Sequence, residues 1–432
     1  MIQQDIIFKR ENTLFKLETY YSPSKNKTYR APIPEGYSGY HADGLKSFAL
    51  MLKNVCDVTS NKLLLLVRST GIAISDGALS NILLSYQEKL LPEKNAILKA
   101  GLTVSYGQID GTAARVRGSN HSTQIICNDL FTSFTTLPTK STLDILAAFQ
   151  GEHSKEQLHM LYNAETVNLL VQQKISVKDR ELVAQIFSKG QVVSYDKFEN
   201  IIEQQHPALY KKPNMYNRVK ESFALSYYHN QEDFPVVRNL VSDNAPEYNK
   251  IPIESHALCW VHEARHYKKL SPFIELHRQI LNTFIDGFWE YYHELLRFKE
   301  NPTEQKAICL ENEFDNIFQP NSVYFQLNQR IEKTIENKDK LLVVLKHPEI
   351  PLHNNLSELG ARLQVRKRDI SLHTMTALGT QLQDAWMTII QTALKHKIDI
   401  FKYIKEFISE SNNWEPLSDI IYQKADYYFN SS

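Results

Sequence analysis

Cysteine is scarce in this chain of 432 residues, and long apolar runs are missing from it. The four cysteines lie far apart and form no CxxC pair, so reduced thiols in a cytoplasmic protein are expected. No apolar run approaches the roughly 20 residues that a bilayer-spanning helix needs. The first residues show no basic segment followed by an apolar one, so no secretory signal is expected. The sequence therefore predicts no contact with a membrane.

Net charge is also missing, because 49 Lys and Arg residues balance 49 Asp and Glu residues. This balance excludes a surface that is basic throughout, but a neutral total can conceal a basic groove. The basic residues do form clusters, at 115–117, 211–212, 265–269 and 362–368. Two interpretations stay open for them: contacts with a polyanion such as DNA, or solvated faces of helices.

The length predicts two or more domains, and the residue periodicity changes along the chain. Residues 1–40 alternate apolar and polar positions, which predicts a small β-rich segment. Residues 41–100 predict a three-helix unit broken at Gly71, with Ser75 as the N-cap of its third helix. A helix, a turn and a further helix fit a helix-turn-helix that contacts DNA, and equally an ordinary packing unit.

Residues 101–270 predict the first part of an α/β core. Three segments rich in β-branched and aromatic residues, TVSYGQIDGTAARVRG, STQIICNDL and FTSFTTLPT, are typical of strands. A helix, STLDILAAFQ, follows them, and a later apolar strand ends at Asp243. This order of elements is the opening of an RNase H-like fold.

Two long helical stretches interrupt that order. Residues 151–232 and residues 271–345 are too long for simple connections, so both are expected to be helical insertions. Residues 346–395 return to the core with a helix that carries Glu358, and residues 396–432 are expected to form a helical tail.

Three acidic residues lie where such a core would bring them together. Asp110 and Asp243 each end a strand-like run, and Glu358 lies on the later helix. Each alone has a plainer interpretation: the aspartates as turn residues, like Asp129, and Glu358 as an exposed partner of Arg362. Mg²⁺ and Mn²⁺ prefer carboxylate oxygens, and two such ions about 4 Å apart can catalyse phosphoryl transfer. The order Asp, Asp, Glu therefore predicts a two-metal site.

The helix around Glu358 is rich in polar and basic residues. Asn355, Glu358 and Arg362 are spaced by three and four, so they fall on one helical face. Arg366 and Lys367 follow on the same helix or its continuation. We expect Arg362, Arg366 and Lys367 to hold the DNA backbone beside the acids; the alternative is a solvated helix end.

A second group of residues follows Asp243 in the segment CWVHEARHYKK. Cys259 and His262 have the CxxH spacing of half a zinc site, but the sequence shows no second CxxC or HxxxH to complete it. The other interpretation is that both pack at a strand-to-helix junction beside the second acid. Arg265 and Lys268 are then expected to face phosphate.

Four segments together resemble the IS66 family of bacterial insertion-sequence transposases, within the DD(E/D) group that has an RNase H-like core. They are SYGQIDGTAARVRG, SDNAPEY, CWVHEARHYKKL and HNNLSELGARLQVRKRDISLHT, and GIAISDGALSNIL is similar to the family's helical unit ahead of the core. The resemblance implies that Asp110, Asp243 and Glu358 are the catalytic metal ligands. It also implies that Cys259 and His262 are the family's pair next to the second acid.

The resemblance implies a DNA transposase that uses two Mg²⁺ or Mn²⁺ ions to cleave transposon ends and to transfer strands into target DNA. Such a protein would act as a homo-oligomer on DNA, with accessory proteins of the same element. Two alternatives stay open: a transposase-derived DNA-binding or regulatory protein that no longer cuts, and a stand-alone RNase H-like nuclease. The chain departs from the family pattern at Leu359, where an arginine is usual, and in the length of residues 151–232.

Overall fold

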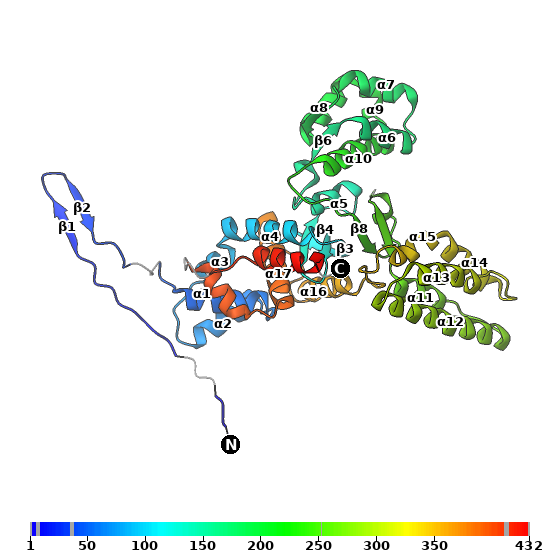
Figure 1. Ribbon diagram of the computed structural model, residues 1–432. Coiled ribbons are helices and arrows are strands. Elements are labelled where there is room, and N and C mark those ends of the chain that lie inside the picture. Colours follow the sequence, from blue (N-terminus) through cyan, green and yellow to red (C-terminus); the bar gives the residue numbers. More distant parts are fainter. Residues whose placement is uncertain (1, 6–8, 35–38, 252, 410–413, 431–432) are drawn as a thin grey trace.

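The computed structural model describes residues 2–5, 9–34, 39–251, 253–409 and 414–430. At its centre lies a five-stranded sheet with the strand order β5-β4-β3-β8-β9 (Figure 1). The strands are β3 (Tyr106–Val116), β4 (Ser119–Cys127), β5 (Thr132–Leu137), β8 (Asn239–Ser242) and β9 (Ser255–Leu258). Strands β3, β4 and β5 form an antiparallel meander, whereas β8 and β9 run parallel to β3. The mixed sheet confirms the predicted α/β core.

Helices cover both faces of this sheet. On one face, α4 (Gln87–Gly101) and α5 (Thr142–Phe149) join the largest hydrophobic core, which also contains Ile126 of β4. On the other face, α16 (Asn355–Ser371) packs on β3 and β4, where Ile125 belongs to a smaller apolar cluster. Ile125 and Ile126 are consecutive, so their side chains point to opposite faces. The helix predicted to carry Glu358 therefore lies across the sheet.

One edge of the sheet is closed by side chains of α17 (Ala377–Lys395). Thr392 Oγ1, Thr388 Oγ1 and Asp384 Oδ2 accept hydrogen bonds from backbone N–H groups of β5 at 3.3, 3.0 and 2.6 Å. The three acceptors are spaced four residues apart and so form one stripe along the helix. They satisfy donors that would otherwise leave β5 open to pairing with another chain.

Among the described residues, four helices precede the sheet: α1 (Asp43–Asn54), α2 (Ser60–Ser69), α3 (Asp76–Leu84) and α4. The predicted cap of the third helix is confirmed, because Ser75 Oγ accepts the N–H of Ala78 at 3.0 Å. The sequence predicts that this third helix continues, but the structure divides it into α3 and α4. Ser85 is extended and Tyr86 is left-handed with φ of 68°, so α4 starts in a new direction.

Two lobes project from the sheet (Figure 1). The first spans residues 159–230, and its helices are α6 (Ala164–Gln172), α7 (Val177–Ile186), α8 (Tyr195–Gln205), α9 (Pro207–Tyr210) and α10 (Pro213–Asn230). It also contains an antiparallel pair, β6 (His159–Tyr162) and β7 (Gln191–Ser194), in a stretch predicted to be helical. Its core is aromatic: the Phe187 and Phe198 rings stack, and the Phe223 ring packs against both at steep angles.

The second lobe spans residues 260–345 and is helical; it includes the insertion expected at 271–345 and also α11 before it. Its helices are α11 (Trp260–Lys268), α12 (Glu275–Glu300), α13 (Glu304–Ile317), α14 (Phe325–Glu336) and α15 (Lys338–Leu341). They pack around Trp260, whose Nε1–H donates to the carbonyl oxygen of Leu341 at 2.9 Å. The lobe is therefore anchored on the residue that directly follows Cys259.

The two ends of the chain differ in how they attach to this body. The hairpin of β1 (Thr19–Ser22) and β2 (Lys27–Arg30) projects away from it (Figure 1), and parts of the segment predicted as β-rich (1, 6–8, 35–38) lie outside the described residues. Helix α18 (Ile400–Ile408) and helix α19 (Leu417–Asn430) contribute to the main core, while 410–413 and 431–432 lie outside the described residues. Among the described residues, no helix has both the length and the apolar character to cross a membrane.

Glu93 of α4 makes the docking of the C-terminal helices dependent on pH. Burial raises its pKa from 4.5 to about 7, against the opposing hydrogen bonds from the Leu417 N–H and the Tyr403 hydroxyl. The folded state therefore prefers the neutral acid, and stability is lost as pH rises from about 4.5 to about 7. We expect Glu93→Gln to stabilise the protein at pH 8 by about 3 kcal/mol, and much less at pH 5, in urea unfolding. Equal gains at the two pH values would contradict this assignment.

Candidate active site

Asp110 and Asp243 lie at the same level on neighbouring strands. Tyr106 of β3 pairs with Asn239 of β8, and Gln108 pairs with Val241, in parallel register. Continuing this register by two residues brings Asp110 level with Asp243, which directly follows β8. Neighbouring strands are about 4.8 Å apart, so the pairing brings the two backbones close together.

Asp110 differs in one respect from its prediction. It does not end its strand, because β3 continues to Val116 and Asp110 pairs with Ile125 of β4. What ends before Asp110 is the pairing of β3 with β8. Residues opposite each other in an antiparallel pair point to the same face, so Asp110 faces α16 as Ile125 does. The prediction that Asp243 follows the end of a strand is confirmed.

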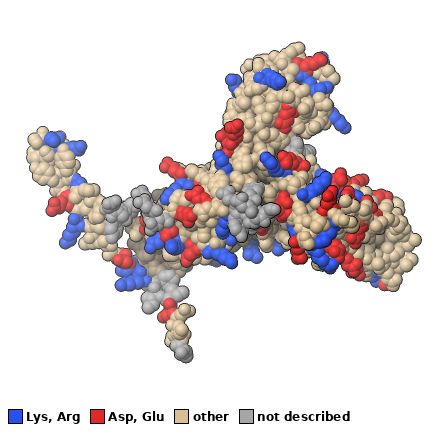
Figure 2. All heavy atoms as spheres, viewed as in Figure 1, with Lys and Arg blue, Asp and Glu red and all other residues tan. Residues whose placement is uncertain are grey.

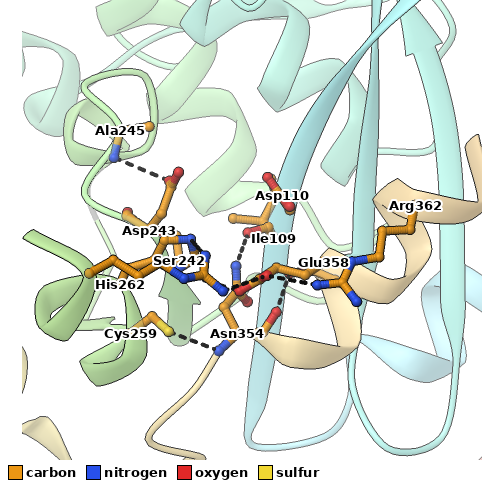
Figure 3. Close-up of polar contacts among 12 residues, drawn as sticks. Ile109, Asp110, Ser242, Asp243, Ala245, Cys259, His262, Asn354, Glu358 and Arg362 are labelled. Atoms are coloured by element: carbon orange, nitrogen blue, oxygen red, sulfur yellow. Dashed lines mark hydrogen bonds and ion pairs between the residues drawn. The ribbon is translucent and has the colours of Figure 1, made fainter. Parts of the chain in front are cut away.

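Burial dominates the electrostatics of Asp110 and raises its pKa to about 6. The N–H of Gly111 donates to Oδ1 at 2.7 Å and opposes that rise, while the charges of Asp243 and Glu358 add to it. Asp243 Oδ1 in turn accepts the N–H of Ala245 at 3.2 Å (Figure 3). The negative charges of Asp243 and Glu358 thus disfavour ionisation of Asp110. A cation bound nearby would stabilise the charged forms of these carboxylates.

Glu358 lies in the first turn of α16, and its carboxylate is turned toward α11. Its Oε2 accepts a hydrogen bond from Arg265 Nη2 at 3.2 Å and lies 3.9 Å from Arg362 Nη2, while Oε1 lies 3.7 Å from His262 Nδ1 (Figure 3). The predicted one-face pairing of Glu358 with Arg362 is therefore present. Two arginines lie beside this carboxylate, whereas neither Asp110 nor Asp243 forms an ion pair with another described residue.

Cys259 and His262 meet Glu358 at the start of α11. Ser242 pairs with Leu258, and the N–H of Cys259 donates to the Ser242 carbonyl at 3.1 Å, so Cys259 is level with Asp243. One ligand atom each of Cys259, His262 and Glu358 lies within 4.8 Å of the other two. The residue that the fold brings to the CxxH pair is thus a glutamate from a distant helix, which sequence spacing does not reveal.

Asn354, rather than Asn355, ties these elements together. Asn355 is exposed, whereas Asn354 is 1% exposed. The Asn354 side chain donates to the carbonyl oxygen of Ile109 at 2.8 Å, and its backbone N–H donates to Cys259 Sγ at 3.3 Å. One residue therefore links β3, α11 and α16 directly beside the acids. The pair of adjacent asparagines was the signal for it, but periodicity alone favours the second.

Tyr248 and Gly111 are further residues that the sequence does not single out. The Tyr248 hydroxyl donates to Gln124 Oε1 at 3.2 Å and lies where a Cβ on Gly111 would come within 2.9 Å of it. Burial and then the charges of Asp110 and Asp243 raise the pKa of Tyr248. Gly111 thus leaves room for a tyrosine that holds the loop after β8 against the sheet.

The basic residues predicted to contact DNA divide into two groups. Arg362 and Arg366 are exposed on α16, and Arg265 and Lys268 are exposed on α11. The prediction for Lys367 is wrong, because this side chain is 6% exposed and its ammonium donates to Asp57 at 2.7 Å and to the carbonyl oxygens of the last two residues of α1. Lys367 therefore joins α16 to the N-terminal helices. Its ammonium is buried and already bonded, so it is not available to contact phosphate.

Comparison with known proteins finds a family model and a relative that match this chain. Residues 232–382 match the model described as "Transposase IS66 family". This match confirms the resemblance of the motifs in residues 232–382 to that family. The match includes Asp243, Cys259, His262 and Glu358 and begins after Asp110. An uncharacterized protein of Sinorhizobium fredii, y4jO, is 28% identical over 337 residues, covering 76% of this chain and 100% of that protein.

Proposed function

We propose that this protein is a DNA transposase that cuts the ends of a mobile element and joins their 3′-hydroxyls to target DNA. Asp110, Asp243 and Glu358 are the carboxylates that hold its metal ions. The strand register that brings Asp110 level with Asp243, with the helix of Glu358 on the same face, is the observation that carries this proposal. The family domain at residues 232–382 supports it independently.

The topology of the sheet supports an RNase H-like core. Three antiparallel strands are followed by two strands parallel to the first, which lies at the centre. The first lobe then enters between the third and fourth strands, and the second lobe enters between the fifth strand and α16. In this description both lobes are insertions that leave the order of the five strands unchanged.

The residues fit divalent metal ions. Asp110 and Asp243 each have one oxygen bonded to a following backbone N–H, and together with Glu358 they would supply the oxygen-rich donor set that Mg²⁺ and Mn²⁺ prefer. Two bound ions would supply an activated hydroxyl and stabilise the leaving oxygen. Glu358 has to turn from Arg265 toward Asp110 to take part, and the exposed Arg265 is then released toward the phosphate backbone.

DNA is expected to approach along α16 and α11. The exposed residues Arg362 and Arg366 are the expected phosphate contacts on α16, and the exposed residues Arg265 and Lys268 are those on α11. In Figure 2 Lys and Arg are interspersed with Asp and Glu over the body and both lobes, in line with the net charge of zero. Affinity therefore depends on a few local cations, and the protein is expected to act as an oligomer with accessory proteins of the same element.

The test is strand cleavage and joining with the purified full chain. Labelled DNA carrying the inverted repeats that flank the gene is incubated with Mg²⁺ or Mn²⁺ and an unrelated plasmid. Nicked ends and joined products are expected, and neither with EDTA. Binding without cleavage would make the protein a transposase-derived DNA-binding protein, and cleavage without joining would make it a nuclease. Either result would overturn the proposal.

Two arginines of α16 are expected to account for part of the non-specific DNA affinity. Arg362→Gln with Arg366→Gln removes two phosphate contacts, so the slope of log K against log salt should fall by about two. The loss should be the same for unrelated DNA sequences, because phosphate contacts carry no sequence information. Fluorescence anisotropy over a salt series measures both effects.

Lys367→Met is the matched control on the same helix. It also removes a positive charge, but one that is bonded to Asp57 inside the protein. We expect an unchanged salt slope and a loss of about 1–3 kcal/mol in the free energy of unfolding. If Lys367→Met flattens the salt dependence as much as the arginine pair, our assignment of the two groups is wrong.

A further inference from the structure

We propose that Cys259, His262 and Glu358 form a transition-metal site, suited to Zn²⁺, beside the all-oxygen site of Asp110 and Asp243. One ligand atom from each residue lies within 4.8 Å of the other two, and His262 Nδ1 is 3.7 Å from Glu358 Oε1. Ligands of a tetrahedral zinc ion lie about 3.5 Å from one another. Small side-chain rotations are enough to close the three atoms around one ion, which leaves a fourth position for water.

Two atoms of this cluster lack the partners that buried polar atoms normally have. His262 Nδ1 and Glu358 Oε1 are both inaccessible to solvent, and neither has a hydrogen-bond partner among the described residues. Their separation of 3.7 Å is too long for a hydrogen bond. A buried unpaired polar atom costs about 1–3 kcal/mol, so native proteins seldom keep two side by side. A cation bound between them would satisfy both.

Backbone N–H groups lie close to the sulfur of Cys259. Cys259 directly precedes α11, and the N–H of Asn354 donates to its sulfur at 3.3 Å. Burial raises the pKa of the thiol, while N–H groups of His262, Asn354 and Val261 act against that rise. Backbone donors and a helix N-terminus stabilise negative charge on sulfur. A donor set of sulfur, imidazole and carboxylate binds Zn²⁺ in preference to Mg²⁺.

Arg265 holds the site when no metal is bound. Its Nη1 donates to His262 Nε2 at 2.8 Å and its Nη2 donates to Glu358 Oε2 at 3.2 Å. Because a guanidinium can only donate, Nε2 accepts and Nδ1 carries the ring proton in this state. Metal bound to Nδ1 moves that proton to Nε2, releases the thiol proton of Cys259 to solvent and forces the exposed Arg265 to turn away. Arg265 and the metal ion therefore compete.

The metal-binding test does not depend on DNA chemistry. Full-length protein with Cys56→Ser and Cys309→Ser, which removes the two exposed thiols, is titrated with Co²⁺. We expect one equivalent to give a sulfur-to-cobalt charge-transfer band and tetrahedral visible bands, which Zn²⁺ then abolishes. Cys259→Ser should remove the charge-transfer band, and His262→Ala or Glu358→Gln should weaken Co²⁺ binding more than about tenfold. Circular dichroism of each variant checks its fold.

Arg265→Ala and Lys268→Ala provide the discriminating pair. Each removes one positive charge from α11, but only Arg265 contacts the cluster, whereas Lys268 lies over the Trp289 ring. Arg265→Ala should tighten Co²⁺ binding several-fold and Lys268→Ala should not. A saturating titration without a sulfur charge-transfer band, or one that Cys259→Ser leaves unchanged, would overturn the proposal.

A consequence for catalysis rests on the proposed function. Glu358 belongs to both sites, so Zn²⁺ at Cys259 and His262 should inhibit Mg²⁺-dependent cleavage, and Cys259→Ser should relieve that inhibition. Zinc binding without any cleavage would leave the metal site standing and remove the transposase proposal. Cleavage without Co²⁺ binding would do the reverse, so the two failures are distinguishable.

Discussion

Asp243→Asn is expected to lower Mg²⁺-dependent DNA cleavage by at least about a thousandfold while leaving DNA binding almost intact. The substitution removes an anionic oxygen at the level of Asp110, and metal ions supply several kcal/mol of transition-state stabilisation in phosphoryl transfer. Binding depends instead on cations that contact phosphate, and Asp243 contributes none. Cleavage of end-labelled DNA and fluorescence anisotropy measure the two quantities on the same preparation.

Asp129→Asn is the control for this substitution. Asp129 is also an aspartate at the end of a strand, but it accepts the Tyr106 hydroxyl at 2.6 Å in the turn between β4 and β5. We expect its cleavage activity to stay near that of the unchanged protein. A parallel loss of binding and cleavage in Asp243→Asn would show that Asp243 is a structural residue, and equal losses in both variants would have the same meaning.

The strands of the core could be predicted from local composition, because β-branched and aromatic residues cluster between turn signals at β3, β4 and β5. The position of Asp243 directly after β8 followed from the apolar run before it. Register could not be predicted in this way. The pairing that brings Asp110 level with Asp243 depends on which strands are neighbours, and the first lobe separates those strands along the chain.

Side-chain roles were harder to predict where two similar residues are adjacent. Asn354 is buried and Asn355 is exposed, although the helical spacing to Glu358 favours Asn355. Lys367 and Arg366 differ in the same way, since one faces the end of α1 and the other faces solvent. Helical periodicity fixes which residues share a face, but the packing of other elements decides whether that face is covered.

The CxxH pair is a further case in which the sequence does not show which residues the fold brings together. The CxxH spacing is visible in the sequence, and its apparent lack of a partner follows from searching for a second pair of the same kind. The third candidate ligand, Glu358, comes instead from α16, on the other side of the second lobe along the chain. A single residue on a distant helix leaves no spacing signal.

Gly360→Ala is expected to reduce cleavage about 10- to 100-fold although it changes no acid. A Cβ on Gly360 would lie 2.7 Å from Ile125 Cγ2, so α16 must move away from the sheet. Displacing Glu358, two residues earlier, by about 1 Å is enough for such a loss. Helix propensity alone predicts that Gly360→Ala raises the free energy of unfolding by about 1 kcal/mol. A loss of about 1–3 kcal/mol would therefore show that the steric conflict outweighs the gain in helix propensity.

Two further variants separate this cause from a general effect of alanine. Gly287 lies in α12, where an added Cβ would meet nothing within 4 Å beyond its chain neighbours and the backbone of the helix itself, so Gly287→Ala should stabilise the protein by about 0.5–1 kcal/mol and leave cleavage unchanged. Ile125→Ala removes the clashing methyl group at a cost of about 2–5 kcal/mol, and adding Gly360→Ala should then refill part of that cavity. The double variant should therefore lose at least about 1 kcal/mol less than the sum of the single variants. Strictly additive losses would mean that α16 does not rest on β4 through this contact, and the position of Glu358 would need another explanation.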